Sequence, residues 1–244
     1  MTENFRSVVS LLCASYEEVN GYDFYRYIFP YNEAQGALYS DFSHPNAIYL
    51  YRDELDAGSG RRLRRRIMLQ DTWQDDYIEF VEGNPMTLCS GLSYRKRANK
   101  LHNGQRMHAL IFDLDGVGEK ELLTLFLRFG KDPERLRTLP MPTFLVASGN
   151  GLHLYYVFEE PVDLYPNIKV QLKSLKYDLT FRIWEYKSTS QAKQIQYQSI
   201  NQCFRMVGSI NSKYGTVIRA FQTGERVSLE YLNQYAAPKN RVDI

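Results

Sequence analysis

Two aspartates follow one of the most apolar short segments of the sequence. Residues 107–112 read Met-His-Ala-Leu-Ile-Phe, and Asp113 and Asp115 come directly after them. This run predicts a buried strand, and side chains two residues apart on a strand point to the same face. Two carboxylates held that close repel each other unless a cation neutralises them. Their oxygen ligands suit Mg²⁺ or Mn²⁺, and a pair of such ions can support nucleotidyl transfer. A turn with Asx hydrogen bonds is the structural alternative.

A histidine follows a glycine-rich turn further along the chain. Residues 148–151 read Ser-Gly-Asn-Gly, and His153 begins the next predicted strand. Glycines allow positive φ and a close approach of the backbone to a ligand, and successive turn amides can form an anion-binding nest. The placement predicts that His153 donates a hydrogen bond to a nucleotide phosphate. A structural histidine is the alternative.

A third group of polar residues lies near the end of the chain. Arg205 and Lys213 flank the segment Gly-Ser-Ile-Asn, which contains Ser209 and Asn211. Arginine can bind phosphate through two donors, and lysine acts as a point charge. The two neutral side chains can add hydrogen bonds. Taken alone, this segment would be an ordinary basic turn.

Together the three groups resemble the archaeo-eukaryotic primase (AEP) superfamily, in its primase-polymerase form from plasmid and mobile-element replication proteins. The segments ALIFDLD, SGNGLHLYY and RMVGSINSK are similar to the family motifs, in the same order, across residues 107–215. The resemblance implies that Asp113 and Asp115 bind Mg²⁺ or Mn²⁺ and, with His153, form the catalytic group. It implies a nucleotide site made by the following residues: Ser148, Gly149, Gly151, His153, Arg205, Ser209, Asn211 and Lys213.

The same resemblance carries expectations for fold, activity and partners. It implies an α+β fold, in which an AEP-like catalytic core with an RNA-recognition-motif-like antiparallel or mixed sheet is joined to an N-terminal α/β lobe. We expect one domain over residues 1–244, with the N-terminal lobe at 1–104 and the catalytic lobe at 105–235. The implied activity is template-dependent primer synthesis or extension. The implied partners are single-stranded DNA, nucleoside triphosphates and a replicative helicase encoded on the same chain or element.

One departure from the family pattern concerns the metal site. The superfamily usually supplies a third carboxylate before the Arg-Gly-Ser segment, whereas residues 191–205 contain no acid. Gln194, Gln196 or Gln198 would then take the place of that acid, or Asp178 or Glu185 would substitute from a predicted helix upstream. The sequence leaves three possibilities: a two-carboxylate site, an acid from elsewhere, or nucleotide binding with reduced catalysis.

Two other functions compete with the polymerase hypothesis. The segment FDLDGV also resembles the nucleophile motif of haloacid-dehalogenase-type phosphatases, which would use Asp113 as nucleophile and Asp115 as acid and base. That family has a parallel Rossmann-like sheet with the motif on its first strand, whereas more than a hundred residues precede the motif here. The missing third acid favours a different alternative, a non-catalytic module that binds nucleotides or nucleic acid.

Charge and composition constrain the partners and the compartment. The net charge is only +2, so the distribution of basic residues is more informative than their sum. Two basic clusters could steer single-stranded template: Arg61, Arg62, Arg64, Arg65 and Arg66 form one, and Arg95, Lys96, Arg97 and Lys100 form the other. A solvated surface is the alternative. Three dispersed cysteines and the lack of a leader or membrane-spanning pattern predict a cytoplasmic protein without membrane contact.

The elements that must position these residues follow from periodicity and turn signals. We expect helices over residues 1–30, 71–82, 119–129, 163–186 and 228–235, the last capped by Ser228. We expect strands over 47–51, 64–70, 107–112, 143–147 and 152–158, with further strands in 203–222. Residues 83–104 are predicted as loop, and 237–244 as a loose polar tail. Among the core candidates of the long helix are Val170, Leu172, Leu175 and Leu179.

Overall fold

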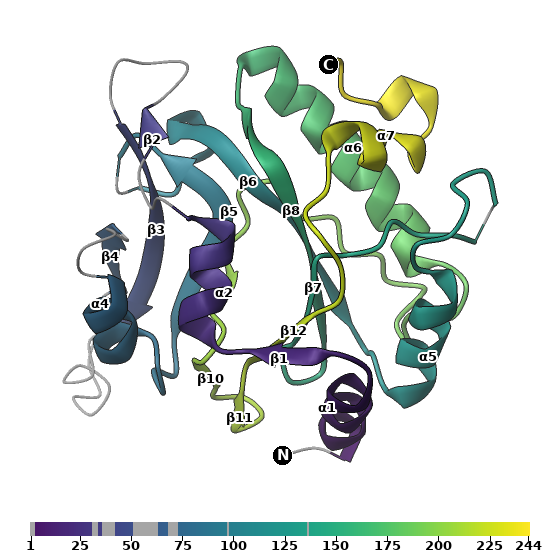
Figure 1. Ribbon diagram of the computed structural model, residues 1–244, viewed down its shortest axis with the longest axis horizontal. Helices are drawn as coiled ribbons and strands as arrows, with labels where there is room; N and C mark the ends of the chain where they lie inside the picture. The colour runs from purple at the N-terminus through teal and green to yellow at the C-terminus, as the bar shows by residue number, and fades with distance from the viewer. Residues whose placement is uncertain are drawn as a thin grey trace.

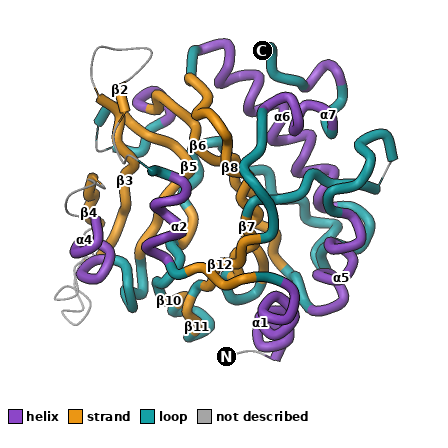
Figure 2. Tube along the Cα trace, in the orientation of Figure 1, coloured by secondary structure: helices purple, strands orange, loops and turns teal. Residues whose placement is uncertain are grey.

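One antiparallel sheet organises the chain (Figures 1 and 2). The computed structural model describes residues 3–30, 34–35, 42–50, 63–67, 73–96, 98–135 and 137–244, and it describes side chains in 3–30 and from residue 73 onward within those ranges. Over these residues the sheet has the strand order β1-β12-β7-β8-β6-β5-β3-β2, with β4 paired to β3 and β9 paired to β5. The pairings between these strands are antiparallel. The architecture is therefore α+β, as the sequence predicts.

The elements have the following bounds. The strands are β1 (Glu17–Val19), β2 (Ala34–Gln35), β3 (Phe42–Leu50), β4 (Leu63–Ile67), β5 (Thr87–Tyr94), β6 (Gly104–Asp115), β7 (Phe144–Ala147), β8 (Gly151–Asp163), β9 (Phe204–Arg205) and β12 (Arg219–Gln222), with a separate hairpin of β10 (Ile210–Asn211) and β11 (Thr216–Val217). The α-helices are α1 (Glu3–Ser15), α2 (Gly21–Ile28), α4 (Trp73–Phe80), α5 (Glu119–Arg128), α6 (Pro166–Trp184) and α7 (Leu229–Gln234). Two 3₁₀ turns are η1 (Leu101–Asn103) and η2 (Pro238–Asn240).

The sheet separates two hydrophobic cores. On one face, α1, α5, α6 and α7 pack against alternate β6 residues that include Leu110, Phe112 and Leu114. On the other face, α2 and α4 pack against the intervening residues Ala109 and Ile111. This alternation is the period of two that a strand buried on both faces requires. Asp113 and Asp115 continue the second series, so they lie on the face of α2 and α4.

The central strands β5 and β6 diverge near the site. They pair only from Leu92 to Tyr94 on β5, and β5 then pairs with β9 at Leu88 and Cys89. Gly91 lies where they separate, and a Cβ added there would stand 2.1 Å from the carbonyl oxygen of Ala109. Only glycine fits this approach, because any other side chain would push the strands apart. The divergence lets the segment before β9 reach the carboxyl end of β6.

Three sequence-based expectations are wrong. The single helix expected over residues 1–30 is two helices separated by β1, which pairs with β12. Asn20 caps the second helix by accepting a hydrogen bond from the Asp23 amide at 2.9 Å. Residues 83–104 contain β5, whose serines and glycine resemble a loop in composition but lie buried in the sheet. The tail is anchored, because Val242 is buried and the Asn233 side chain bonds its backbone.

Most remaining elements are confirmed. The hairpin of β7 and β8, the helices α4, α5, α6 and α7, and the pairing of β3 with β4 lie where expected, with ends shifted by a few residues. Ser228 caps α7 through the Tyr231 amide. Val170 is an exception among the core candidates, since it is 66% exposed whereas Leu172, Leu175 and Leu179 are buried. Among the described residues, no helix combines the length and apolar character needed to cross a bilayer.

Candidate active site

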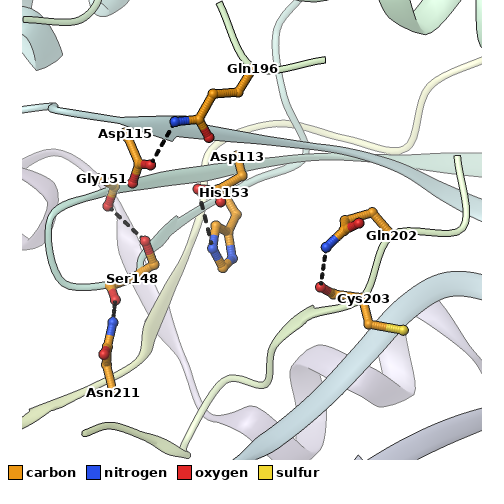
Figure 3. Close-up of polar contacts among 9 residues, drawn as sticks. All are labelled: Asp113, Asp115, Ser148, Gly151, His153, Gln196, Gln202, Cys203 and Asn211. Carbon is orange, nitrogen blue, oxygen red and sulfur yellow. Dashed lines mark hydrogen bonds and ion pairs between the residues drawn. The ribbon is translucent and has the colours of Figure 1, made fainter. Parts of the chain in front are cut away.

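The two aspartates stand at the carboxyl end of β6, next to β8. In the register of these strands Asp113 faces His153, and Asp115 faces Gly151. Both aspartate side chains are half-buried. Figure 3 shows both carboxylates at the same end of the strand, beside the His153 ring. The spacing of two residues on a strand therefore places them as the sequence predicts.

The electrostatics of Asp113 are those of a carboxylate that lacks a full counter-charge. Burial and then the neighbouring Asp115 carboxylate together raise the pKa of Asp113 to about 7, although the Lys176 ammonium opposes both effects. Burial lowers the pKa of Lys176 to about 7, against the effect of Asp113. A divalent cation between the two aspartates would remove their repulsion. This donor set therefore fits a hard cation such as Mg²⁺ or Mn²⁺.

His153 is a buried, neutral ring. Its Nε2 atom lies 3.6 Å from Oδ1 of Asp113 (Figure 3), and only 4% of the residue is exposed. Burial, followed by the Arg205 cation, lowers the pKa of His153 to about 3. The ring therefore carries no charge near neutral pH, so its contact with Asp113 is not an ion pair. Its Nδ1 atom is buried without a hydrogen-bond partner among the described residues.

A polar pocket of about 380 Å³ brings most of the predicted residues together. It is open to solvent and is lined by charged groups of both signs, the two aspartates on one side and Arg205 and Lys213 among the rest. Of the predicted residues, the pocket lining includes Asp113, Asp115, Ser148, His153, Arg205, Asn211 and Lys213. The segments that carry them are separated by up to about a hundred positions in sequence, and the pairing of β9 with β5 places Arg205 beside Leu88 in the pocket lining.

The other residues predicted to bind the nucleotide support the pocket without lining it. Gly149 has a φ of 123°, and a Cβ there would lie 2.8 Å from the Tyr214 ring. Gly151 lies against the Leu114 backbone and accepts hydrogen bonds from Ser148. Ser209 is 1% exposed and its hydroxyl donates to the Met206 carbonyl at 2.6 Å, so it supports its own turn. These three residues do not line the pocket.

Asn211 connects two of the predicted motifs. Its Nδ2 donates to the Ser148 carbonyl at 2.7 Å (Figure 3), and its Oδ1 accepts from the Lys213 amide at 3.2 Å. The glycine turn and the β10 turn are thereby held together. Asn211 thus fixes the positions of neighbouring pocket residues, and both ends of its side chain are engaged within the chain.

The side chain of Gln196 contacts the Asp115 carboxylate. The segment 191–202, which we call the glutamine strap, passes the end of β6, and Nε2 of Gln196 lies 3.3 Å from Oδ2 of Asp115 (Figure 3). The strap is tied to β6 by Thr189, whose hydroxyl donates to the Asp115 carbonyl at 2.5 Å. Of the three glutamines considered for the place of the acid, Gln196 is the one bonded to Asp115.

The two upstream acids considered as substitutes are engaged elsewhere. Oδ2 of Asp178 accepts from the Ala237 amide at 2.7 Å, and Glu185 interacts with Arg128 at the end of α6. Neither acid lines the pocket. Among the described residues there is no cluster of three or more histidine, cysteine, aspartate or glutamate side chains suited to a metal. Of the carboxylates among the described residues, Asp113 and Asp115 are the two that line this pocket.

The structure describes the basic clusters only in part. Arg61, Arg62 and Arg97 lie outside the described residues, and β4 carries Arg64, Arg65 and Arg66 with only its backbone described. Lys96 and Lys100 are exposed and Arg95 is half-buried. None of the three lines the pocket. Their role in binding a template strand stays a prediction.

Sequence reasoning missed several residues of this region. Lys176 is 1% exposed, and its Nζ donates to the Ser199 carbonyl at 2.9 Å. The sequence contained a signal for the burial of Lys176, because this residue falls on the apolar stripe of α6 between Leu172 and Leu179. Tyr214 and Gln202 also line the pocket, and no pattern in the sequence distinguished them from other tyrosines and glutamines.

Comparison with known proteins identifies the fold. No family model and no curated protein matches the sequence. Among solved structures, the chain is similar to the AEP domain of the primase-polymerase of cyanophage S-2L, with a TM-score of 0.50 and 15% identity over 79% of this chain and 89% of that domain. At this identity the likeness concerns the fold. The antiparallel sheet also differs from the parallel sheet that the phosphatase alternative requires. The chain therefore has the fold of an AEP primase-polymerase domain.

Proposed function

We propose that this protein is a metal-dependent nucleotidyltransferase, a primase-polymerase that synthesises or extends primers on single-stranded DNA. One observation carries the proposal. Two carboxylates and two cations, Asp113 and Asp115 with Arg205 and Lys213, line one open pocket in an AEP-like fold. Carboxylates suit the metal, and the cations suit the triphosphate of the same substrate.

The reaction would join the 3′-oxygen of a primer to the α-phosphorus of a nucleoside triphosphate. The bond from that phosphorus to the leaving pyrophosphate breaks, and the hydroxyl proton is lost to solvent or a nearby base. Asp113 and Asp115 would hold the divalent cation, which when bound supplies Lewis-acid neutralisation of the charge on phosphate and hydroxyl oxygens. Arg205 and Lys213 would bind triphosphate oxygens.

His153 and the glycine turn would orient the substrate. Because the His153 ring is neutral, it can offer one hydrogen bond without adding positive charge beside the metal site. The turn at residues 148–151 is rigidly placed by Asn211 and by the Leu114 backbone. A pre-positioned turn lowers the entropic cost of aligning the α-phosphorus with the primer.

Several finer features belong to this proposal. The whole of residues 1–244 would act as one domain, with the template strand held by the basic clusters before residue 101. A replicative helicase and the replication of a plasmid or other mobile element would provide the biological setting. These features rest on the resemblance of the motifs.

The test is primer synthesis and extension on single-stranded DNA with labelled ribo- and deoxynucleotides, in Mg²⁺ and in Mn²⁺. We expect product from the wild-type protein and at least a hundredfold loss in Asp113→Ala/Asp115→Ala, since metal ligation is worth several kcal/mol at the transition state. The matched control is Asp75→Ala/Glu79→Ala, which removes two exposed acids of α4. Absence of product with every nucleotide and ion contradicts the proposal.

A non-catalytic nucleotide-binding module is a second candidate, favoured by Gln196, whose neutral amide donates to the Asp115 carboxylate. Equilibrium binding of a labelled triphosphate distinguishes the two functions. Saturable binding without primer extension under every condition supports the module. Robust extension that depends on Asp113 excludes it.

A further inference from the structure

Lys176 is a buried cation beside the candidate metal site. Its ammonium donates one hydrogen bond, to the Ser199 carbonyl of the glutamine strap, and it lies 5.9 Å from the centre of the Phe112 ring and 5.7 Å from that of Phe204. The carboxylate that interacts with it electrostatically is Asp113. A lysine buried in this way is costly unless an anion offsets its charge. Lys176 thus places positive charge near Asp113, which directly follows Phe112 on β6.

Gln196 limits the negative charge that is available beside Asp115, the other aspartate. Its amide stands where a carboxylate would add a third negative charge, and it meets Asp115 through its NH₂ group. If the amide turned, its oxygen would be a neutral ligand, which binds a hard cation more weakly than a carboxylate does. Lys176 holds the same strap through Ser199, three positions further on. The helix α6, through Lys176, thus fixes the strap and adds positive charge near the site.

The charges lining the pocket sum to zero. This sum holds for the ionised carboxylates: Asp113 and Asp115 contribute two negative charges, and Arg205 and Lys213 contribute two positive charges. Lys176 is buried and is not part of the pocket lining, and its protonated form adds one more positive charge. A free divalent cation gains little from such a field and must still lose part of its hydration shell. A metal–triphosphate complex is an anion, and it brings its own oxygens to the metal.

We propose that this pocket takes up its divalent ion as a complex with a nucleoside triphosphate and does not hold the free ion. Lys176 and Gln196 impose this order of binding, in which the free ion is not bound before the nucleotide. Lys176 does so by its positive charge, and Gln196 does so because it supplies no negative charge. The inference rests on the proposed function, because it assumes that a triphosphate is the ligand of Arg205 and Lys213.

The experiment measures Mn²⁺ binding and nucleotide binding separately. Free Mn²⁺ is titrated into the nucleotide-free protein and followed by the electron paramagnetic resonance signal of the unbound ion. Binding of a labelled triphosphate with an imido group between the α- and β-phosphorus is followed by equilibrium dialysis, with and without Mn²⁺. For the wild-type protein we expect no saturable Mn²⁺ binding below about 1 mM and Mn²⁺-dependent binding of the analogue.

Two variants should convert the pocket into a site for the free ion. Gln196→Glu adds the missing charge on an exposed part of the strap, and Lys176→Met removes the buried charge while a flexible side chain of similar length keeps the contacts with both rings. Each is expected to tighten binding of free Mn²⁺ by about tenfold or more. The matched control is Gln194→Glu, the same change two positions away, which should alter affinity by less than about threefold.

The outcomes separate this inference from the proposed function. If wild-type protein binds free Mn²⁺ as tightly as Gln196→Glu does, the order of binding is wrong. If Gln194→Glu tightens binding as much as Gln196→Glu, the site-specific role of Gln196 is wrong. If the analogue fails to bind wild-type protein in Mn²⁺, the proposed function itself fails. Thermal denaturation shows whether Lys176→Met is folded, and Gln196→Glu decides the matter if it is not.

Discussion

Asp113 is the residue on which the electrostatics of the pocket converge. It is next to Asp115 in the site, it shares a contact with His153, and it interacts with the buried Lys176. Its raised pKa means that the folded protein retains a proton there at pH values where the unfolded chain has released it. The ionised carboxylate is thus a destabilising feature of the metal-free protein, retained at the site where a cation would be bound.

This pKa gives a signed prediction for stability. The contribution of Asp113 is fully present below its ordinary pKa of 3.8 and is lost as the pH rises through about 7. Asp113→Asn should therefore exceed wild type in free energy of unfolding by on the order of 1 kcal/mol at pH 8, and the difference should shrink toward pH 5. Urea denaturation across this range measures it, with Asp75→Asn as control. A variant less stable than wild type at pH 8 would mean that Lys176 outweighs both burial and Asp115.

His153 allows a test of whether a neutral side chain orients the triphosphate. His153→Ala should weaken triphosphate binding about tenfold, corresponding to the loss of one hydrogen bond of about 1.4 kcal/mol. Because the ring is neutral down to about pH 3, the effect should be constant between pH 6 and 8. Equilibrium dialysis with the imido analogue measures it, and His102→Ala, which removes an exposed side chain of η1, is the control. A loss that appears only at the acidic end would show that the protonated ring is the form that binds.

At the scale of elements, the site depends on how α5 and α6 are joined. Arg128, at the end of α5, is 4% exposed, and its guanidinium donates to the carbonyls of Arg182, Ile183, Glu185 and Arg137 and to the Ser188 hydroxyl. It thereby satisfies the last carbonyls of α6, which otherwise lack partners. The chain continues from this point to Thr189 and the glutamine strap. The position of Gln196 therefore depends on this junction.

Replacing Arg128 by methionine should cost about 3 kcal/mol of unfolding free energy, because several buried carbonyls would lose a charged donor at once. Urea denaturation measures this loss, and Arg135→Met on the neighbouring exposed loop should change stability by less than about 0.5 kcal/mol. A cost below about 1 kcal/mol for Arg128→Met would show that water replaces the guanidinium readily and that the junction is loose.

At the scale of the whole molecule, the two expected lobes share one sheet. β3 and β5 belong to the N-terminal lobe and β6 and β8 to the catalytic lobe, yet all four are contiguous in the strand order. The core on the face of α2 and α4 also combines residues from both lobes, such as Phe24 and Trp73 with Phe144 and Tyr155. A boundary near residue 104 would cut through paired strands and a shared core. This arrangement favours a single cooperative unit.

Two tryptophans provide the test of cooperativity. Trp73 lies in the N-terminal lobe and Trp184 at the end of α6, and each is 1% exposed. In Trp73→Phe and in Trp184→Phe, the fluorescence of the remaining tryptophan should change at the same urea concentration as the far-ultraviolet circular dichroism. Residues 1–104 expressed alone should not fold. Separated transitions in either variant, or a folded 1–104 fragment, would contradict the single-domain proposal.

The sequence by itself determined the features that depend on neighbours along the chain. The apolar run before Asp113 and Asp115, the glycine turn before His153, and the periodicity of α5 and α6 are local patterns, and the fold confirms the elements that they predict. The primase-like architecture was implied by the resemblance of three motifs to a known family, since their fixed order is more specific than any one of them.

Tertiary structure alone decided what stands around those residues. β5 could not be recognised in the sequence, because its serines and glycine owe their strand conformation to burial between neighbouring strands. Gln196 could be chosen over Gln194 and Gln198 only once the strap was placed at the end of β6. Lys176 interacts with Asp113 because α6, more than 60 positions later in the chain, packs against β6. Burial and charge act through space, so the pKa of Asp113 depends on groups that its sequence neighbours cannot reveal.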